Sequence, residues 1–279
     1  MSFRFRHALC NEVYKDWDFR AACQSIRKAG YTGIEIAPFT LAKDPCTLTP
    51  VQRRKCKAIM ADEGLEFVGL HWLMVSPAGL HVTTPEHSLR ARSWRHIHDL
   101  IDLCADLGPN GVMIFGSPKQ RTSVGGIGAA AATKNYVDGM ATAGRWAEQR
   151  GITLLIEALP PADTDVVTSL DEAASWVGKI GNPAVRTMFD SHNAIQETEP
   201  HAVLVKRHFS LIRHVHVNEL DGKHPGRGNY DFKPVLSALA AGGYQGWISL
   251  EAFDFSFGAE TIANESIRHM EGQIAALSL

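Results

Sequence analysis

The sequence of 279 residues is poor in cysteine and contains no long apolar run. Its five cysteines are scattered, odd in number and include no CxxC pair, which argues against a disulfide framework and against a thiolate metal site. No stretch of about 18 consecutive apolar residues is present to span a bilayer. Near the N-terminus, Asn11, Glu12, Lys15 and Asp16 interrupt the short apolar run that a secretory signal would need. We therefore expect a cytoplasmic protein with reduced thiols and no membrane partner.

An excess of basic charge is also absent. The chain has 28 basic and 30 acidic residues and a formal net charge of −2, so no general attraction to nucleic acid or to an anionic membrane is expected. Its 45% hydrophobic and 21% charged residues are ordinary for a globular chain that buries a large core. These proportions favour a small-molecule partner over a polyanionic one.

Short β-rich runs alternate with segments that have helical spacing of apolar residues, as in Phe19, Ala22, Cys23 and Ile26. Alternation of this kind builds parallel βαβ units, and eight units close a barrel of about 250 residues. We therefore predict an α/β protein, a (β/α)8 TIM barrel in a single domain over residues 1–279. The eight predicted strands cover residues 6–12, 33–38, 66–72, 111–117, 153–159, 185–191, 212–219 and 247–253.

A doubly wound dinucleotide-binding sheet is the main alternative fold. That fold needs a glycine-rich turn directly after its first strand, and no such turn occurs here. The segment GGIGAA (125–130) resembles the fingerprint, but it follows a loop instead of a strand. The barrel therefore remains the predicted fold.

Four residues that prefer hard metal ions stand at the ends of predicted strands five to eight. They are Glu157, Asp190, His216 and Glu251. Three carboxylates and one imidazole form a ligand set for a divalent ion, and barrel enzymes keep their chemistry at the carboxyl ends of their strands. The pattern predicts one divalent-metal site at the mouth of the barrel.

These four residues resemble the Glu–Asp–His–Glu site of the ketose 3-epimerases, in the xylose-isomerase-like TIM-barrel superfamily. The resemblance extends to GYTGIEIAP (30–38) and to the stretch from His216 and Glu219 through Gly228. It implies an ion of the Mn²⁺ type, with Mg²⁺ or Co²⁺ as alternatives. It also implies that Glu157 and Glu251 act as acid and base on opposite faces of an enediolate, and that the protein is a homodimer or homotetramer.

Three positions depart from the epimerase pattern. The epimerases carry Asp-x-x-His, whereas His192 stands one residue earlier here, in Asp190-Ser191-His192-Asn193. Gly222, beside Lys223, stands where they have an arginine, and Asp163 stands where they have a glutamate. The metal ligands thus match, while the residues that would contact substrate oxygens differ.

Other side chains are candidates for substrate binding at the same mouth. An aromatic face at Trp72 either stacks on a sugar ring or packs the barrel rim. Basic side chains after strand four either bind a substrate carboxylate or phosphate or remain solvated loop charges. His214 shares a face with His216 and is expected behind the metal ligands or in the core. The candidate substrate contacts are Glu12, His71, Trp72, Lys119, Arg121, His192, Glu219 and Lys223.

The leading function is a divalent-metal-dependent isomerase or epimerase acting on a ketose or related keto-polyol by proton transfer. A metal-dependent lyase or dehydratase of a 3-oxo-sugar, inosose or keto-glycoside begins with the same proton abstraction, so the ligand set does not separate the two. An abasic-site endonuclease would need a histidine-rich multi-metal site and a basic surface. A non-catalytic binding module would not need two opposed glutamates at one ion.

Overall fold

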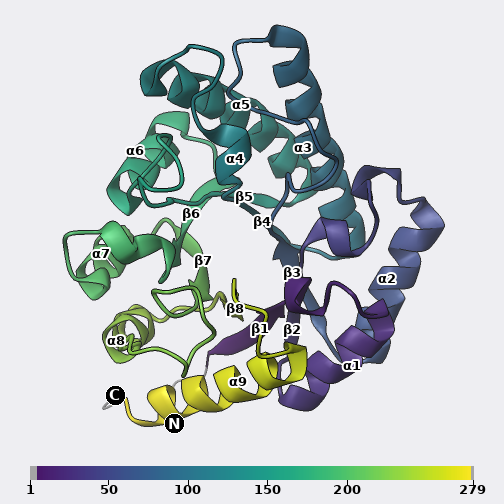
Figure 1. Ribbon diagram of the computed structural model, residues 1–279, viewed down its shortest axis with the longest axis vertical. Coiled ribbons are helices and arrows are strands. Elements are labelled where there is room, and N and C mark those ends of the chain that lie inside the picture. Colours follow the sequence, from purple (N-terminus) through teal and green to yellow (C-terminus); the bar gives the residue numbers. More distant parts are fainter. Residues whose placement is uncertain (1–4, 278–279) are drawn as a thin grey trace.

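A computed structural model describes residues 5–277 of the chain. Eight parallel strands pair in sequence order, and β1 pairs with β8 to close the barrel (Figure 1). The predicted limits 1–279 also include residues 1–4 and 278–279, which lie outside the described residues. The (β/α)8 barrel is confirmed. Its strands are β1 (Arg6–Cys10), β2 (Gly33–Ile36), β3 (Glu66–Leu70), β4 (Val112–Phe115), β5 (Thr153–Ile156), β6 (Val185–Asp190), β7 (Ile212–Val217) and β8 (Trp247–Leu250).

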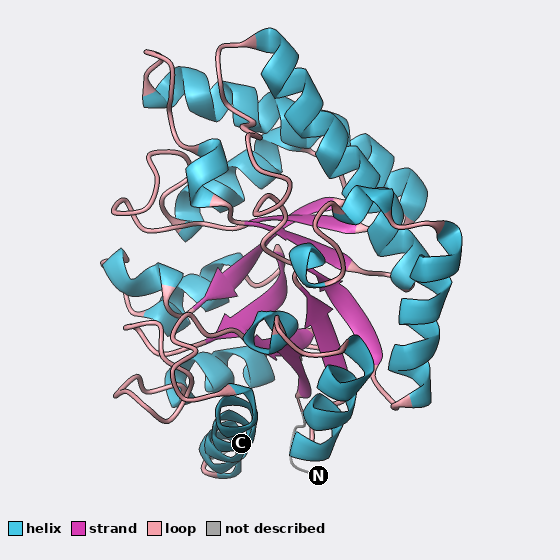
Figure 2. Cartoon of the chain, turned by 45° about the vertical axis from the view of Figure 1, so that its right-hand side comes forward, coloured by secondary structure: helices cyan, strands magenta, loops and turns pink. Residues whose placement is uncertain are grey.

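Helices surround the strands as an outer ring (Figure 2). They are α1 (Phe19–Ala29), α2 (Pro50–Asp62), α3 (His87–Leu107), α4 (Pro118–Arg121), α5 (Ala129–Arg150), α6 (Leu170–Ile180), α7 (His201–His208), α8 (Lys233–Ala241) and α9 (Ala259–Ala275). Short 3-10 helices lie in the loops of the described chain: η1 (Asn11–Tyr14), η2 (Pro38–Thr40), η3 (Pro45–Thr47) and η4 (Asn193–Gln196).

The apolar faces predicted for the helices point into the core. In α1, Ala22, Cys23 and Ile26 are buried against the barrel, as the spacing of apolar residues predicts. Gly30 ends this helix with φ 114°, a left-handed conformation that allows the chain to turn back into β2. Within residues 5–277, none of the helices combines the length and apolarity that a membrane span requires.

The strand ends place the polar residues at one rim. Each predicted strand is present but shorter than its β-rich run, because the last residues of the run leave the sheet. Glu157 and Glu251 directly follow β5 and β8, and Asp190 is the last residue of β6. In the register of β6 and β7, Asp190 is the partner of His216. The four predicted ligands therefore meet at the carboxyl end of the barrel.

Candidate active site

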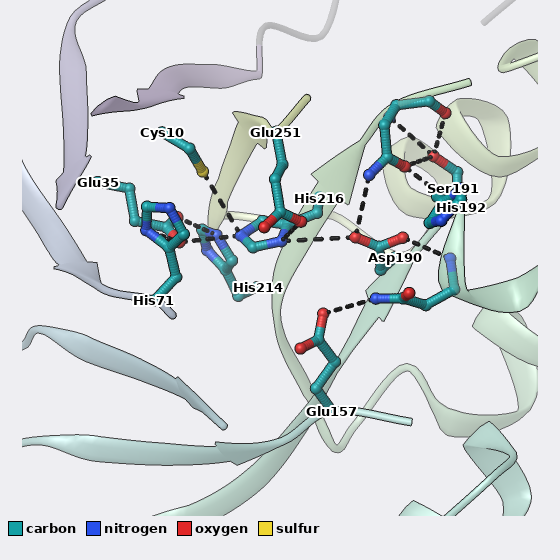
Figure 3. Close-up of polar contacts among 12 residues, drawn as sticks. Cys10, Glu35, His71, Glu157, Asp190, Ser191, His192, His214, His216 and Glu251 are labelled. Carbon is teal, nitrogen blue, oxygen red and sulfur yellow. Dashed lines mark hydrogen bonds and ion pairs between the residues drawn. The ribbon is translucent and has the colours of Figure 1, made fainter. Parts of the chain in front are cut away.

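The predicted metal ligands form one buried cluster. Glu157, Asp190, His216 and Glu251 each offer a ligand atom, and these atoms all lie within 4.8 Å of one another. Figure 3 shows the four side chains, which come from neighbouring strands, directed toward a common centre. The barrel therefore brings together every residue of the predicted set.

His216 faces the cluster with one defined nitrogen. Its Nδ1 lies 3.0 Å from Glu251 Oε2 and 3.5 Å from Asp190 Oδ2. Its Nε2 points the other way, into the barrel (Figure 3). Nδ1 is thus the ring atom that is available as a ligand.

Asparagine side chains and a tryptophan hold the carboxylates in place. Asn193 donates its Nδ2 proton to Glu157 Oε1 at 3.0 Å and its backbone N–H to Asp190 Oδ1 at 2.7 Å. Trp72 donates from Nε1 to Glu251 Oε1 at 2.7 Å. Asn218 Nδ2 also donates to Asp190 Oδ2 at 3.3 Å, so each carboxylate has at least one oxygen fixed by the protein.

The electrostatics of the cluster are those of crowded buried acids. Burial, followed by the charges of Glu251 and Asp190, raises the pKa of Glu157 to about 8. Burial also raises the pKa of Glu251, although His216 opposes the shift. Burial would raise the pKa of Asp190 as well, but hydrogen bonding and charge from His216 lower it overall. In His216, burial favours the neutral ring, yet Glu35 and Glu251 raise its pKa well above the usual value.

A divalent cation fits this donor set. In the described part of the chain, no ion pair joins a lysine or arginine to Glu157, Asp190 or Glu251. His216 is thus the basic partner that Asp190 and Glu251 share, and three buried carboxylates beside one imidazole are costly unless an ion or protons neutralise them. Three carboxylate oxygens and an imidazole nitrogen are donors that Mn²⁺ and Mg²⁺ accept. The residues present therefore suit the ion that the sequence predicts.

A cavity of about 400 Å³ opens over the cluster. Glu157 and Glu251 lie in its wall, together with Asn193 and Lys119. The Lys119 side chain is exposed, and no acidic partner for it is found within residues 5–277. The other lining residues are mostly apolar: His71, Trp72, Val75, Ile114, Gly116, Ser117, Pro118, Gln120, Leu159 and Phe253.

Trp72 forms the aromatic wall of the cavity. Its ring is stacked between Phe39 and Phe253, with ring centroids 6.0 and 6.1 Å away. Its backbone has φ 50°, an unusual conformation for a large side chain and one that concentrates at functional sites. The ring therefore packs the barrel rim and also lines the cavity, so the structure is compatible with both roles predicted for Trp72.

His71 and Glu12 lie deeper in the barrel as a buried pair. His71 Nε2 is 2.7 Å from Glu12 Oε2, and both side chains are inaccessible to solvent except where His71 reaches the floor of the cavity. Burial would lower the pKa of His71, but Glu12 raises it overall. Glu12 itself does not line the cavity. Of this pair, only His71 is placed to touch a ligand.

Arg121 requires a correction, since it was expected as a substrate contact or a solvated loop charge. The side chain is fully buried. Its Nη1 donates to the backbone carbonyls of Phe115 and Glu157 at 3.0 and 2.7 Å, and its Nη2 donates to that of Val167 at 3.3 Å. Arg121 therefore ties the ends of β4 and β5 together and does not line the cavity.

His192 also lies outside the cavity lining. Its Nδ1 donates to the carbonyl of Leu220 at 2.7 Å, and its ring packs on Phe253 with centroids 4.9 Å apart. The next residue, Asn193, occupies the cavity wall instead. The shift of one position relative to the epimerase motif thus places an amide where the motif has an imidazole.

Glu219 and Lys223 likewise lie apart from the cavity. Glu219 accepts the backbone N–H groups of Gly226 and Tyr230 at 2.8 and 2.9 Å, so it shapes the loop after β7. Lys223 is partly exposed and pairs with Asp221 at 2.7 Å. The structure assigns both residues contacts within their own loop.

Sequence reasoning assigned no role to Glu35 or Asn193. Glu35 is a carboxylate within the apolar run GIEIAP, and it is completely buried inside the barrel. A charged residue in the middle of a strand that is buried on both faces was the available signal. Burial opposes ionisation of Glu35, but His216 and His214 hold its pKa well below the usual range.

The model for the xylose isomerase-like TIM barrel family matches residues 23–273. The chain therefore belongs to this family. It is 21% identical over 244 residues to the D-psicose 3-epimerase of Ruminiclostridium cellulolyticum, and the matched region covers 86% of this chain and 80% of that protein. It is 26% identical over 138 residues to the inosose dehydratase of Geobacillus thermodenitrificans, which covers 42% of this chain and 45% of that protein.

Solved structures share the same architecture. The crystal structure of D-psicose 3-epimerase with D-tagatose from Clostridium cellulolyticum H10 matches with a TM-score of 0.84 at 19% identity. The match covers 98% of this chain and 100% of that chain. At this identity the likeness establishes the fold.

Proposed function

We propose that the protein is a divalent-metal-dependent sugar isomerase or epimerase that moves a proton next to the carbonyl of a ketose or related keto-polyol. One observation carries the proposal: Glu157 and Glu251 belong to the same four-ligand cluster and both lie in the wall of one cavity. The curated relatives named as epimerases and dehydratases support this class of chemistry.

The proposal gives each part of the cluster a role. Glu157, Asp190, His216 and Glu251 would hold the ion, which when bound supplies Lewis acidity that makes a C–H bond beside a substrate carbonyl more acidic. Glu157 and Glu251 are then the two carboxylates that remove and return the proton from opposite sides of the substrate. Asn193 and Trp72 orient them by fixing one oxygen of each.

Polar groups in the cavity wall are proposed to contact the substrate hydroxyls. Ser117 lines the cavity, and its buried Oγ has no hydrogen-bond partner among residues 5–277. Asn193 and Gln120 add amides to the same wall. The apolar side of a sugar ring would lie against the edge of Trp72 that lines the cavity, since Phe39 and Phe253 already stack on the ring.

A metal-dependent dehydratase is the second candidate. The inosose dehydratase relative favours it, as does the position of His192, whose ring is turned toward Leu220 instead of the cavity. Both reactions begin with removal of the same type of proton. They differ in the next step, because a dehydratase expels a hydroxyl group from the neighbouring carbon while an epimerase returns the proton.

The test is exchange of substrate hydrogen with solvent deuterium, with Mn²⁺ present and a panel of ketoses and inososes as substrates. We expect label at the carbon beside the carbonyl, and the product distinguishes an epimer from a dehydrated compound. In Glu157→Gln and Glu251→Gln, exchange should fall by about 10²–10⁴-fold in protein that retains metal. Exchange at the wild-type rate in both metal-loaded variants would refute the two-glutamate mechanism.

A matched control is Glu66→Gln. Glu66 is an exposed carboxylate at the start of β3, at the opposite end of the barrel, where it pairs with Arg6. The same loss of one carboxylate there should leave both metal content and exchange rate unchanged.

A further inference from the structure

Glu35 is a buried carboxylate that the proposed reaction does not use. It lies on β2, it is fully buried, and it is not part of the cavity wall. Its register partner on β1 is Cys10, and Figure 3 shows its side chain beside His71 and His214, on the side of His216 away from Asp190. A residue in this place cannot touch substrate, and its effect must pass through the groups that it contacts.

Those groups are three imidazoles. Glu35 Oε1 lies 2.9 Å from His216 Nε2 and 3.3 Å from His71 Nδ1. Glu35 Oε2 lies 2.7 Å from His214 Nε2. Of these contacts, the one to His216 has hydrogen-bond geometry. Glu35 is therefore the acceptor for the nitrogen of His216 that faces away from the metal ligands.

A neutral imidazole carries its proton on only one nitrogen, and the partner of one nitrogen decides the state of the other. A carboxylate at Nε2 keeps the proton there and leaves the Nδ1 lone pair directed at the cluster. Without that acceptor, the proton is free to sit on Nδ1, where Glu251 Oε2 at 3.0 Å would accept it. The ligand atom would then be blocked by its own hydrogen.

We infer that Glu35 is a positioning residue that sets the tautomer and orientation of His216 for metal binding. The inference rests on the proposed metal site and adds a residue to it that is not itself a ligand.

The remaining contacts of the network hold Glu35 in this role. Glu12 lies 2.7 Å from His71 Nε2, so the other nitrogen of His71 faces Glu35. Carboxylates and imidazoles thus alternate from Glu12 through His71 and Glu35 to His216. A connected buried network of this kind fixes side-chain orientation more firmly than one isolated pair.

The competing explanation is that Glu35 only stabilises the barrel by neutralising buried histidines. That role predicts a lower melting temperature when Glu35 is replaced, with no change in the affinity of the folded protein for metal. A positioning role predicts a change in affinity and in the protonation of the His216 ring. The two roles are therefore separable by measurement.

The experiment is titration of metal-free protein with Mn²⁺, followed through the electron paramagnetic resonance signal of free Mn²⁺. In Glu35→Leu, which removes the acceptor, we expect the Kd to rise about 10–100-fold, the usual effect of losing such a partner. In Glu35→Gln the rise should be smaller, because an amide oxygen still accepts the Nε2 proton. Circular dichroism and thermal melting in EDTA establish that each variant is folded.

The matched control is Cys10→Ala. Cys10 Sγ lies 3.8 Å from the same His216 Nε2 and is equally buried, but its loss leaves the carboxylate in place. Its Mn²⁺ affinity should equal that of the wild type. Nitrogen-15 NMR of the Zn²⁺-loaded proteins provides a second readout, which should show a protonated Nε2 in the wild type and in the control.

Wild-type affinity and wild-type ring resonances in folded Glu35→Leu would overturn the inference. If Glu35→Leu does not fold, Glu35→Gln decides through its affinity, since it keeps the shape of the side chain; a Kd equal to that of the wild type would overturn the inference as well. If the wild type binds no Mn²⁺, the proposed metal site fails first. If the wild type binds Mn²⁺ and the Glu35 variants bind it with the same Kd, only the inference about Glu35 fails, and the proposed metal site stands.

Discussion

Metal affinity should depend steeply on pH, because the cluster holds protons that an ion must displace. The pKa of Glu157 is raised to about 8, first by burial and then by the charges of Glu251 and Asp190. Below about pH 8 the metal-free protein keeps a proton on this carboxyl group, and above it the group is an ionised ligand. Affinity should therefore rise with pH through the range in which Glu157 loses its proton.

The structure gives the size of the effect. Each pH unit below the pKa costs about 1.4 kcal/mol for one displaced proton, so a change from about pH 8 to about pH 6 should weaken binding about 100-fold. His216, whose pKa is also raised, adds a second proton and makes the dependence steeper. Isothermal titration with Mn²⁺ in buffers of different ionisation enthalpy measures the protons released on binding.

A variant that lacks the titrating carboxyl group is the control for this pH dependence. Glu157→Gln should bind more weakly but with a flatter pH dependence, because the titrating group is gone. Release of no proton by the wild type, with an affinity constant across this pH range, would refute the picture of crowded buried acids.

Three further changes have expected outcomes. A Cβ at Gly116 would overlap Glu157 Oε2, so Gly116→Ala should displace that carboxylate and weaken Mn²⁺ binding, and a wild-type Kd would contradict the close approach. Arg121→Met removes the guanidinium donor from three buried carbonyls, of which that of Phe115 keeps Tyr136 Oη and that of Val167 keeps the Leu159 N–H, and should lower the free energy of unfolding in urea by about 1–3 kcal/mol; a loss well below about 1 kcal/mol would show that water replaces the guanidinium. Lys119→Met should raise KM for substrates that carry a carboxylate or phosphate and leave it unchanged for neutral ones, and equal changes for both would remove Lys119 from anion recognition.

The barrel and the cluster were predictable from sequence because both depend on regular geometry. Parallel strands bring their carboxyl ends to one rim, so acidic residues and a histidine at four successive strand ends are expected to meet there. The structure brings Glu157, Asp190, His216 and Glu251 together as that argument requires. Their roles as metal ligands follow from donor chemistry and stay a proposal.

The surroundings of the cluster were less predictable because they depend on contacts between distant segments. Arg121 is a charged loop residue in sequence, but its partners are carbonyls at positions 115, 157 and 167, which only the closed barrel brings together. The turn after β6 directs Asn193 into the cavity and His192 away from it, and spacing alone does not reveal such a rotation. In the sequence, Glu35 is a charged residue within an otherwise apolar strand. Its contact with His216 Nε2 is visible only in the folded barrel.

Elemental analysis of protein purified without chelator tests the central claim most directly. The wild type should contain about one divalent ion per chain, as expected for a single four-ligand site. His216→Ala, which removes the imidazole ligand, should lose the ion, while His98→Ala, which alters a half-buried histidine on α3 outside the cluster, should retain it. Equal metal content in the wild type and in His216→Ala would contradict the account.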